Sequence, residues 1–428
     1  MSILKSLLAY FLILQSVLAC IIFPTYVFAS AQDRLTISDP QFEIEVVAQG
    51  FDFPTSMAFL GAEDIIVLEK DSGTVKRVIN GQILEESLID VPVASKGERG
   101  LLGSAIIANE RNPYPYVFLY YTESTTDKDG SDADIENQTL GNRLYRFEFT
   151  HDALMNPKLI LDLPANVPAH TIPFHNGGKV LIGPDENVYL VMGDLESRKT
   201  QAQNIQGGPE PDGTGVIYRL TQDGKSAENN PLGDTHPANK YYAYGIRNSF
   251  GMDFDPMTGS LWNTENGPTY GDEINLVEPG FNSGSLEVHG MSSADKNFDL
   301  DKLVDFDGKG KYSDPEFVWQ IPIGVTALQF LDSDKYGEEY ENDMFVGDIT
   351  HGNIYHFDLN GNRTELSLPS QLEDKVANNL LEAKDVIFGQ GFGGITDMVV
   401  GPDGYLYVLA INRFREDNAG TIYRIVPI

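Results

Sequence analysis

Four short segments of the sequence combine glycines with side chains that can bind a ligand or move a proton. They are GERGLLG at 97–103, FHNGG at 174–178, YGIRNSFG at 244–251 and TENGPTYGDEIN at 264–275. In the second segment His175 stands before two glycines, which allow another group to approach the backbone closely, and an apolar run follows. An imidazole is largely neutral at neutral pH and can accept a proton there. We therefore expect His175 at the mouth of a strand, where it could act on a bound molecule.

The other candidate groups are an arginine, an asparagine and a turn. Arg247 and Asn248 are adjacent and lie between an aromatic run and a strand pattern. Gly267 and Pro268 form a turn whose backbone carbonyls can point at a ligand or a cation. Because these segments are far apart in the sequence, they can form one pocket only if the fold brings their loops together.

Each of these residues also has a purely structural interpretation. His175 can be a loop residue that is hydrogen-bonded to a neighbouring structural unit, and Arg247 can pair with Glu265 or Asp272. Asp272 and Glu273 are expected to accept backbone N–H bonds and so to fix their own loop. The residues alone leave the structural and the functional interpretation open.

The elements that must hold these loops are repeated pairs of strands. Apolar strands joined by Gly-Pro-Asp or Asp-Pro turns recur as KVLIGPDENVYLVMGD, GMDFDPMTGSLWNTENG and MVVGPDGYLYVLAINRF, with looser copies beginning at Ser56, Ser104 and Ala327. Alternating apolar and polar positions between the turns indicate half-buried antiparallel strands, and helical periodicity is almost absent. Repetition at roughly 45 to 75 residues predicts an all-β fold, a six-bladed β-propeller with long inserted loops.

The two ends of the chain suggest how such a ring would close. FEIEVVAQG at 42–50 is an isolated strand pattern before the first unit, and the last unit ends with GTIYRIVPI at 420–428. We predict that the N-terminal strand joins the last blade, which would cover an open sheet edge. Two stacked sandwich domains are the alternative, but no Pro/Ser-rich linker divides the chain.

Composition and the N-terminal segment predict where the protein works. The chain has 30 Lys and Arg against 63 Asp and Glu, so nucleic acid and anionic membrane surfaces would repel it. Residues 1–31 have the pattern of a cleaved export signal, and an uncleaved membrane tether through residues 7–29 is the alternative. Both place residues 32–428, a single propeller domain, outside the cytoplasm: secreted, periplasmic or at the cell surface. The only cysteine, Cys20, lies in the apolar segment, so the mature chain has no disulfide.

Taken together, the motifs resemble those of the soluble PQQ-dependent glucose/sorbosone (aldose sugar) dehydrogenase family, six-bladed propellers that use pyrroloquinoline quinone (PQQ). The resemblance runs from about Phe51 to Ile428. In family order its carriers are GERGLLG, HNGGKVLIGPDENVYLVMGD, YGIRNSFGMDFDPMTG, ENGPTYGDEINLVEPGFNSG and GPDGYLYVL. They are specific for the fold and the family, and less specific for activity, because relatives of this fold act as binding modules.

The resemblance implies a role for each candidate residue. His175 would be the general base that takes the proton from the anomeric hydroxyl of a sugar while hydride passes to the quinone. Arg247 would stabilise negative charge on the quinone oxygens, with Asn248 donating a hydrogen bond. The backbone carbonyls of Gly267 and Pro268 would hold a calcium ion that polarises the quinone.

Other positions that would contact PQQ depart from the family pattern. Glu98 stands where the family has a glutamine, and Phe174 where an acidic residue is usual. Thr350 aligns with a cofactor-binding lysine, and Gly394 and Thr396 align with a pair of arginines. Because PQQ carries three carboxylates, three missing cations would cost several kcal/mol of affinity at about 1.5 to 3 kcal/mol per charged hydrogen bond. The candidate replacements are Lys96, Arg99, Arg413 and Arg415.

Three functions therefore remain open on the sequence. The first is an exported dehydrogenase that oxidises a small-molecule sugar, an aldose, at the anomeric carbon with hydride transfer to PQQ. The second is a non-enzymatic propeller that binds a carbohydrate or a protein and has a decayed PQQ site. The third is a calcium-dependent, lactonase-like hydrolase that uses Glu98 and Asn248. We favour the first because the base, the arginine and the calcium turn occur together, while the sugar, the electron acceptor and the oligomeric state are not fixed.

Overall fold

The computed structural model of the chain describes residues 35–108, 113–125, 139–168, 171–411 and 418–428. Leu35–Ile428 form a unit separate from Met1–Arg34, so the predicted signal or tether lies outside the described residues. Within those ranges no helix is long and apolar enough to cross a membrane. The helices there are single 3-10 turns: η2 (Gln201–Gln203), η3 (Ala238–Lys240), η4 (Ser292–Ala294), η5 (Leu300–Lys302), η6 (Asp334–Tyr336), η7 (Ser370–Leu372) and η8 (Ala383–Val386).

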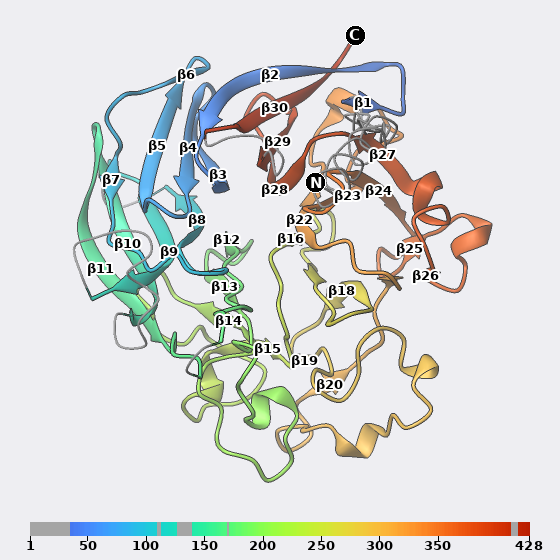
Figure 1. Cartoon of the computed structure of the whole chain (residues 1–428). Coiled ribbons are helices and arrows are strands. Elements are labelled where there is room, and N and C mark those ends of the chain that lie inside the picture. The colour runs from blue at the N-terminus through green and yellow to red at the C-terminus, as the bar shows by residue number, and fades with distance from the viewer. Residues whose placement is uncertain (1–34, 109–112, 126–138, 169–170, 412–417) are drawn as a thin grey trace, which may run out of the picture. The chain divides into compact units, whose positions relative to one another are not determined.

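The strands of the described residues form six sheets (Figure 1). The first contains β3 (Pro54–Gly61), β4 (Asp64–Glu69), β5 (Thr74–Ile79), β6 (Gln82–Ile83) and β7 (Ile89–Asp90). The second contains β8 (Leu101–Ile107), β9 (Tyr116–Ser124), β10 (Thr139–Thr150) and β11 (Ala153–Leu163). The third contains β12 (Val180–Ile182), β13 (Val188–Met192), β14 (Val216–Leu220), β15 (Tyr241–Tyr244), β19 (Phe281–Asn282) and β20 (Lys311–Tyr312).

The remaining three sheets follow in chain order. The fourth contains β16 (Met252–Phe254), β17 (Leu261–Glu265), β18 (Asp272–Val277), β21 (Phe317–Trp319) and β26 (Val376–Ala377). The fifth contains β22 (Val325–Phe330), β23 (Met344–Asp348), β24 (Ile354–Leu359), β27 (Ile387–Gln390), β1 (Thr36–Ile37) and β25 (Leu366–Ser367). The sixth contains β28 (Gly394–Val400), β29 (Leu406–Ile411), β30 (Gly420–Pro427) and β2 (Phe42–Phe51).

The strand order confirms an all-β propeller and corrects the predicted blade count. In the described residues, the first five sheets each take four antiparallel strands in chain order, which is the form of a propeller blade. The sixth has only three such strands, and its fourth, β2, comes from the other end of the chain and pairs antiparallel with β30. Five chain-continuous blades are thus present in the described residues instead of the predicted six, because the outer strand of the last sheet is β2.

The predicted turns hold the strand pairs in the same way in different sheets. In the Gly-Pro-Asp turn between β12 and β13, the Tyr189 hydroxyl donates to Asp185 at 3.2 Å. In the matching turn between β28 and β29, the Tyr407 hydroxyl donates to Asp403 at 2.9 Å. An Asp side chain favours such turns because it can accept local hydrogen bonds. The repeat seen in the sequence is therefore a repeat of turn chemistry as well as of apolar strands.

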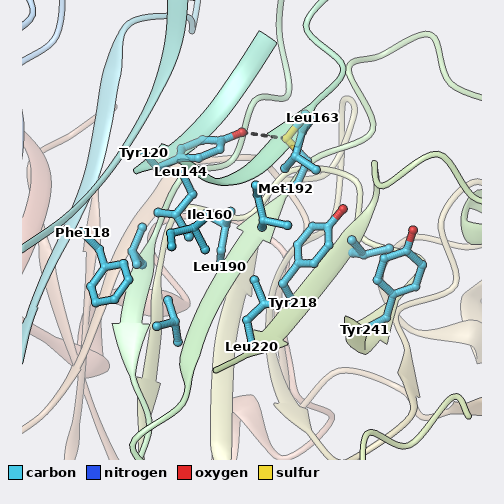
Figure 2. Close-up of a cluster of buried hydrophobic side chains, with 14 of the residues drawn as sticks. Phe118, Tyr120, Leu144, Ile160, Leu163, Leu190, Met192, Tyr218, Leu220 and Tyr241 are labelled. Carbon is cyan, nitrogen blue, oxygen red and sulfur yellow. Dashed lines mark hydrogen bonds between the residues drawn. The ribbon is translucent and has the colours of Figure 1, made fainter. Parts of the chain in front are cut away.

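Apolar side chains fill the space between neighbouring sheets. One buried cluster joins the second and third sheets and contains Phe118, Leu144, Leu190, Tyr218 and Tyr241 (Figure 2). Equivalent clusters join each following pair of sheets, and one that includes Phe51, Met57, Leu409 and Ile422 packs the sixth sheet against the first. Burial of this apolar surface stabilises the fold by roughly 25 cal/mol per Å². The loops that lead into the first strand of each sheet are held on this packed framework.

Candidate active site

One cavity collects loops from all six sheets. Its volume is about 320 Å³. Five predicted site residues line it: Glu98, His175, Arg247, Asn248 and Thr396. Three others, Gly267, Pro268 and Thr350, are not among its lining residues, although Ile349, next to Thr350, is. The loops that are far apart in the sequence thus meet at this cavity, as expected, and we take the cavity as the candidate active site.

His175 is held rigidly by a buried carboxylate. The residue lies before β12 with its backbone in the left-handed region, at a φ of 60°. Its Nδ1 lies 2.6 Å from the Asp194 Oδ1, and both side chains are buried. Asp194 is fixed in turn, because its Oδ1 accepts the Glu196 N–H at 2.6 Å and its N–H donates to the Arg247 carbonyl at 2.9 Å. An ionised Asp194 accepts Nδ1–H, so the neutral ring then carries its lone pair on Nε2.

The two glycines after His175 are required by close backbone contacts. A Cβ on Gly177, whose φ is 61°, would lie 2.7 Å from the Val191 carbonyl oxygen. A Cβ on Gly178, whose φ is 129°, would lie 2.8 Å from the Leu102 Cβ of β8, and the Gly178 carbonyl oxygen would lie 1.9 Å from a Cβ on Gly103 of the same sheet as Leu102. Only glycine fits where two backbones approach so closely. The predicted reason for the HNGG pattern is therefore confirmed, with the second sheet as the approaching group.

Glu98 binds the protein's own backbone. Its Oε2 accepts the His175 N–H at 2.6 Å and the Asn176 N–H at 3.3 Å. The Asn248 amide donates to the same carboxylate at 3.1 Å, while the Asn248 Oδ1 accepts the Gly177 N–H at 3.3 Å. Burial raises the pKa of Glu98, and the nearby His175, Asn248 and the two N–H groups oppose that rise. Glu98 and Asn248 together fix the backbone that carries the imidazole.

The Arg247 side chain reaches the Gly267-Pro268 turn, and among the described residues it has no ion pair. Its Nη1 donates to the carbonyl oxygens of Asn266 at 2.7 Å and Gly267 at 3.0 Å. Glu265 accepts the backbone N–H of Arg247 at 2.6 Å, so the predicted pairing of the guanidinium with Glu265 is wrong. Asp272 is engaged elsewhere, as the sequence predicted for it: it accepts N–H bonds from Gly267, Ile323 and Gly324.

Two lysines that were not predicted from the sequence motifs bring cationic groups to the cavity. Lys179, directly after HNGG, lines the cavity and its Nζ lies 2.6 Å from the Asp397 Oδ1. Lys70, after β4, also lines it and donates to the carbonyls of Ser95, Gly97 and Arg99. The position of Lys179 beside the motif was a usable signal, whereas nothing in the sequence pointed to Lys70. Both lysines therefore add a cationic group to a cavity that lacks the lysine and the arginines of the family pattern.

The other candidate replacements do not reach the cavity in the described residues. Arg99 is buried and its Nη2 donates to the Ala165 carbonyl. Neither Arg99 nor Lys96 is among the lining residues. Arg413 and Arg415 lie outside the described residues. Of the positions that align with family arginines, Thr396 lines the cavity and its hydroxyl donates to the Leu409 carbonyl at 3.3 Å, while Gly394 is the buried first residue of β28.

A cluster of buried titratable groups lies behind Arg247 and was not predicted. Glu265 and Glu273 are directly opposite each other on β17 and β18. Burial raises the pKa of Glu265 to about 7 and that of Glu273 well above its usual value. His289 stacks edge-on against Tyr270, and burial together with the charge of Arg247 lowers its pKa to about 4. These groups favour a proton on the acid pair and a neutral imidazole at neutral pH.

The raised pKa of Glu265 predicts a pH-dependent stability. The unfolded chain releases this proton near pH 4.5 and the folded chain near pH 7, so the folded state binds more protons between these values. The free energy of unfolding should therefore fall as the pH rises across this window, by up to about 3 kcal/mol from this group. Denaturant unfolding of Glu265→Gln over a pH series should show a fall that is smaller by this amount, because other buried acids such as Glu273 still contribute, whereas the exposed control Glu338→Gln should keep the full fall. An unchanged slope in Glu265→Gln would refute the assignment.

The match to known proteins covers almost the whole described unit. A family model described as glucose/sorbosone dehydrogenase matches residues 51–424. The aldose sugar dehydrogenase YliI of Escherichia coli is 26% identical over 389 residues, which cover 90% of this chain and 92% of that protein. Quinoprotein glucose dehydrogenase B of Acinetobacter calcoaceticus is 29% identical over 267 residues, which cover 58% of this chain and 53% of that protein.

Solved structures agree in fold. The soluble aldose sugar dehydrogenase of Escherichia coli, in its apo form, has a TM-score of 0.66 at 22% identity, with 90% of this chain and 100% of that chain covered. The PQQ-bound aldose sugar dehydrogenase of Streptomyces coelicolor has a TM-score of 0.63 at 22% identity, with coverage of 90% and 99%. Because the family model spans well over half of the sequence, this chain belongs to the glucose/sorbosone dehydrogenase family, a family of sugar-oxidising enzymes.

Proposed function

We propose that the protein is an exported, PQQ-dependent dehydrogenase that oxidises an aldose at its anomeric carbon. The observation that carries this proposal is the cavity in which His175, oriented by the buried Asp194, and Arg247 lie together. A base and a cation in one enclosed site are what removal of a proton and of a hydride from a sugar requires. Family membership supports the same reaction, since the named relatives are aldose sugar and glucose dehydrogenases.

The cavity residues fit PQQ, a flat molecule with three carboxylates. Arg247 contributes positive charge, Lys70 and Lys179 add cationic groups that are ion-paired with Asp71 and Asp397, and Leu102 and Phe250 contribute apolar surface. Among the described residues, Arg247 has no carboxylate partner, so its guanidinium is available to an anion. The two acids at the wall are already satisfied: Asp397 by Lys179, and Glu98 by N–H donors. Thr396 would contribute a neutral contact at the wall, whereas Thr350 does not line the cavity.

The residues fit calcium less well. The Gly267 carbonyl already accepts a hydrogen bond from Arg247, and Pro268 is exposed beside it. A cation at this carbonyl would lie next to the guanidinium and be repelled by it. Within the described ranges no three His, Cys, Asp or Glu residues gather as a metal site. Calcium at this carbonyl would need Arg247 to move, and the proposed proton transfer to His175 does not require it.

In the proposed reaction His175 acts at its Nε2. The chemistry supplied by bound PQQ is hydride acceptance. His175 would take the proton of the sugar's anomeric hydroxyl, and the positive charge that then forms on the imidazole would be stabilised by Asp194. Asp194 also prevents the ring from turning, because it holds Nδ1 at 2.6 Å. Its role is to position the base.

Arg247, Asn248 and Glu98 would complete the site. Arg247 would hold the negatively charged end of the cofactor, and its backbone carbonyl, bonded to the Asp194 N–H, would keep the arginine in register with the base. Glu98 accepts the His175 N–H and Asn248 accepts the Gly177 N–H, and these bonds fix the backbone that carries the base. Glu98 is engaged by this structural task, which argues against its use as the carboxylate of a lactonase-like hydrolase.

We extend the proposal to the architecture and the location. Residues 32–428 would form one domain whose ring is closed by β2 as the outer strand of the sixth sheet, which is supported by the pairing of β2 with β30 and by the cluster that packs the sixth sheet against the first. Export through residues 1–31 rests on the sequence pattern alone. A ring closed by both chain ends would hold the loops of all six sheets at one site.

Cofactor titration tests the proposal directly. Purified protein would be titrated with PQQ, with and without calcium, while the absorbance of the quinone and the aldose-dependent reduction of a dye are followed. Saturable binding followed by dye reduction is expected. Absence of binding at high micromolar PQQ in both series would reject the proposed function and favour a propeller that binds carbohydrate without redox chemistry.

A further inference from the structure

A second cavity lies apart from the active site, between the second and third sheets. Its volume is about 670 Å³. Ile160, Leu161 and Leu163 of β11 form its apolar wall, and the rings of Tyr218 and Tyr241 stand at 83° to each other with centroids 5.4 Å apart. Figure 2 shows these two rings side by side with their hydroxyls directed to the same side. Neither the proposed mechanism nor the strand pairing uses this space.

Two polar groups at this cavity lack a partner in the described residues. The Tyr241 hydroxyl is fully buried and has no partner with the geometry of a full hydrogen bond, and only weak contacts with the Tyr218 hydroxyl and the Gly213 N–H oppose the rise in its pKa that burial causes. Tyr218 instead donates to the Gly213 carbonyl at 2.8 Å. The Lys240 amine has no hydrogen bond or ion pair there, and burial lowers its pKa. A buried hydroxyl and a half-buried amine without partners are costly, and a ligand could satisfy both.

The charges around the cavity argue for a neutral ligand. Asp162 is paired with Arg143, and Asp212 accepts the Thr214 hydroxyl at 2.6 Å. Asp212 also lies 3.5 Å from the Arg198 Nε, so among the described residues Glu210 at the exposed rim is the one lining carboxylate without a cation, and it would repel an anion. A cation would meet Lys240. A neutral molecule avoids both costs.

We infer that this cavity is a second carbohydrate-binding site, which takes a neutral sugar of one or more rings. A sugar presents hydroxyls that both donate and accept, and an apolar C–H face. The cavity presents the matching set: the Lys240 amine as a donor, Asp212 as an acceptor, Tyr241 as either, and an aromatic and aliphatic wall. The inference is independent of the redox chemistry, because none of these residues lines the first cavity.

Calorimetric titration of the purified protein with maltotriose would test the second site. Saturable binding is expected, and Lys240→Met should weaken it about tenfold or more, and Tyr241→Phe about two- to tenfold. Both variants should fold normally, because neither removed group has an internal partner; unchanged thermal unfolding midpoints would verify this. The matched controls Tyr242→Phe and Lys225→Met, which lie outside the cavity, should bind like the parent protein.

The same titration separates this site from the active site. His175→Asn should leave the maltotriose affinity of the second cavity unchanged even if it abolishes aldose oxidation. No saturable binding, or binding that Lys240→Met and Tyr241→Phe leave unaltered, would overturn the inference. Either result could occur with a fully active dehydrogenase, so failure of this site and failure of the proposed function are distinguishable.

Discussion

Replacement of His175 by asparagine is expected to lower kcat for aldose oxidation by about 10²- to 10⁴-fold, the usual contribution of a general base. Asparagine is the informative substitute because His175 has a φ of 60°, a conformation that Asn tolerates better than other residues without a base. Its amide can still donate to Asp194, as Nδ1–H does now. The variant therefore removes Nε2 while keeping the backbone and the buried carboxylate satisfied, and steady-state dye reduction with saturating PQQ would measure the loss.

A matched control uses another histidine with the same backbone. His151, on the exposed turn between β10 and β11, has a φ of 58°. His151→Asn should leave kcat unchanged, and both variants should bind PQQ like the parent protein in an absorbance titration. If His175→Asn kept activity within about tenfold of the parent, another group would have to take the proton, and His175 would be a structural residue.

The convergence of His175, Arg247 and Asn248 could be predicted because each lies in a motif that combines glycine with a polar side chain next to a strand. Such motifs record a local need: a Cβ at Gly177 would collide with the Val191 carbonyl, and this requirement appears in the sequence as glycine. The Gly-Pro-Asp turns, in which an Asp accepts a hydrogen bond from a Tyr hydroxyl, could be predicted for the same reason. Local backbone chemistry is visible in a sequence whenever only a few residue types satisfy it.

Contacts between distant segments were not visible in this way. Glu98 was expected to bring a charge of the wrong sign to the cofactor, but the fold directs it at the His175 and Asn176 N–H groups, 77 and 78 residues away. Pairing with an acid was one of the two interpretations of Arg247, but its guanidinium reaches two carbonyls. In each case the partner is set by how the sheets pack.

Lys179 and Asp397 show what such a distant contact contributes. They join the segment before β12 to β28, with 12% and 3% of their side chains exposed and 2.6 Å between Nζ and Oδ1. Asp397 also accepts the N–H groups of Met57 and Met398, each at 3.0 Å. Lys179→Met is therefore expected to lower the free energy of unfolding by about 3 to 5 kcal/mol, because it leaves a buried carboxylate without its cation. Urea unfolding would measure the loss.

The double variant Lys179→Met/Asp397→Asn decides whether this lysine serves only the fold. It removes both charges, and the Asn oxygen can still accept one of the two N–H groups, so most of the lost stability should return. A double variant as unstable as Lys179→Met would contradict the pairing. Because the recovered protein is folded, its PQQ affinity can be measured without interference from unfolding. A loss of about tenfold or more would mean that Lys179 shares its charge with the cofactor and replaces one missing family cation, whereas unchanged affinity would leave Arg247 as the principal anion-binding group.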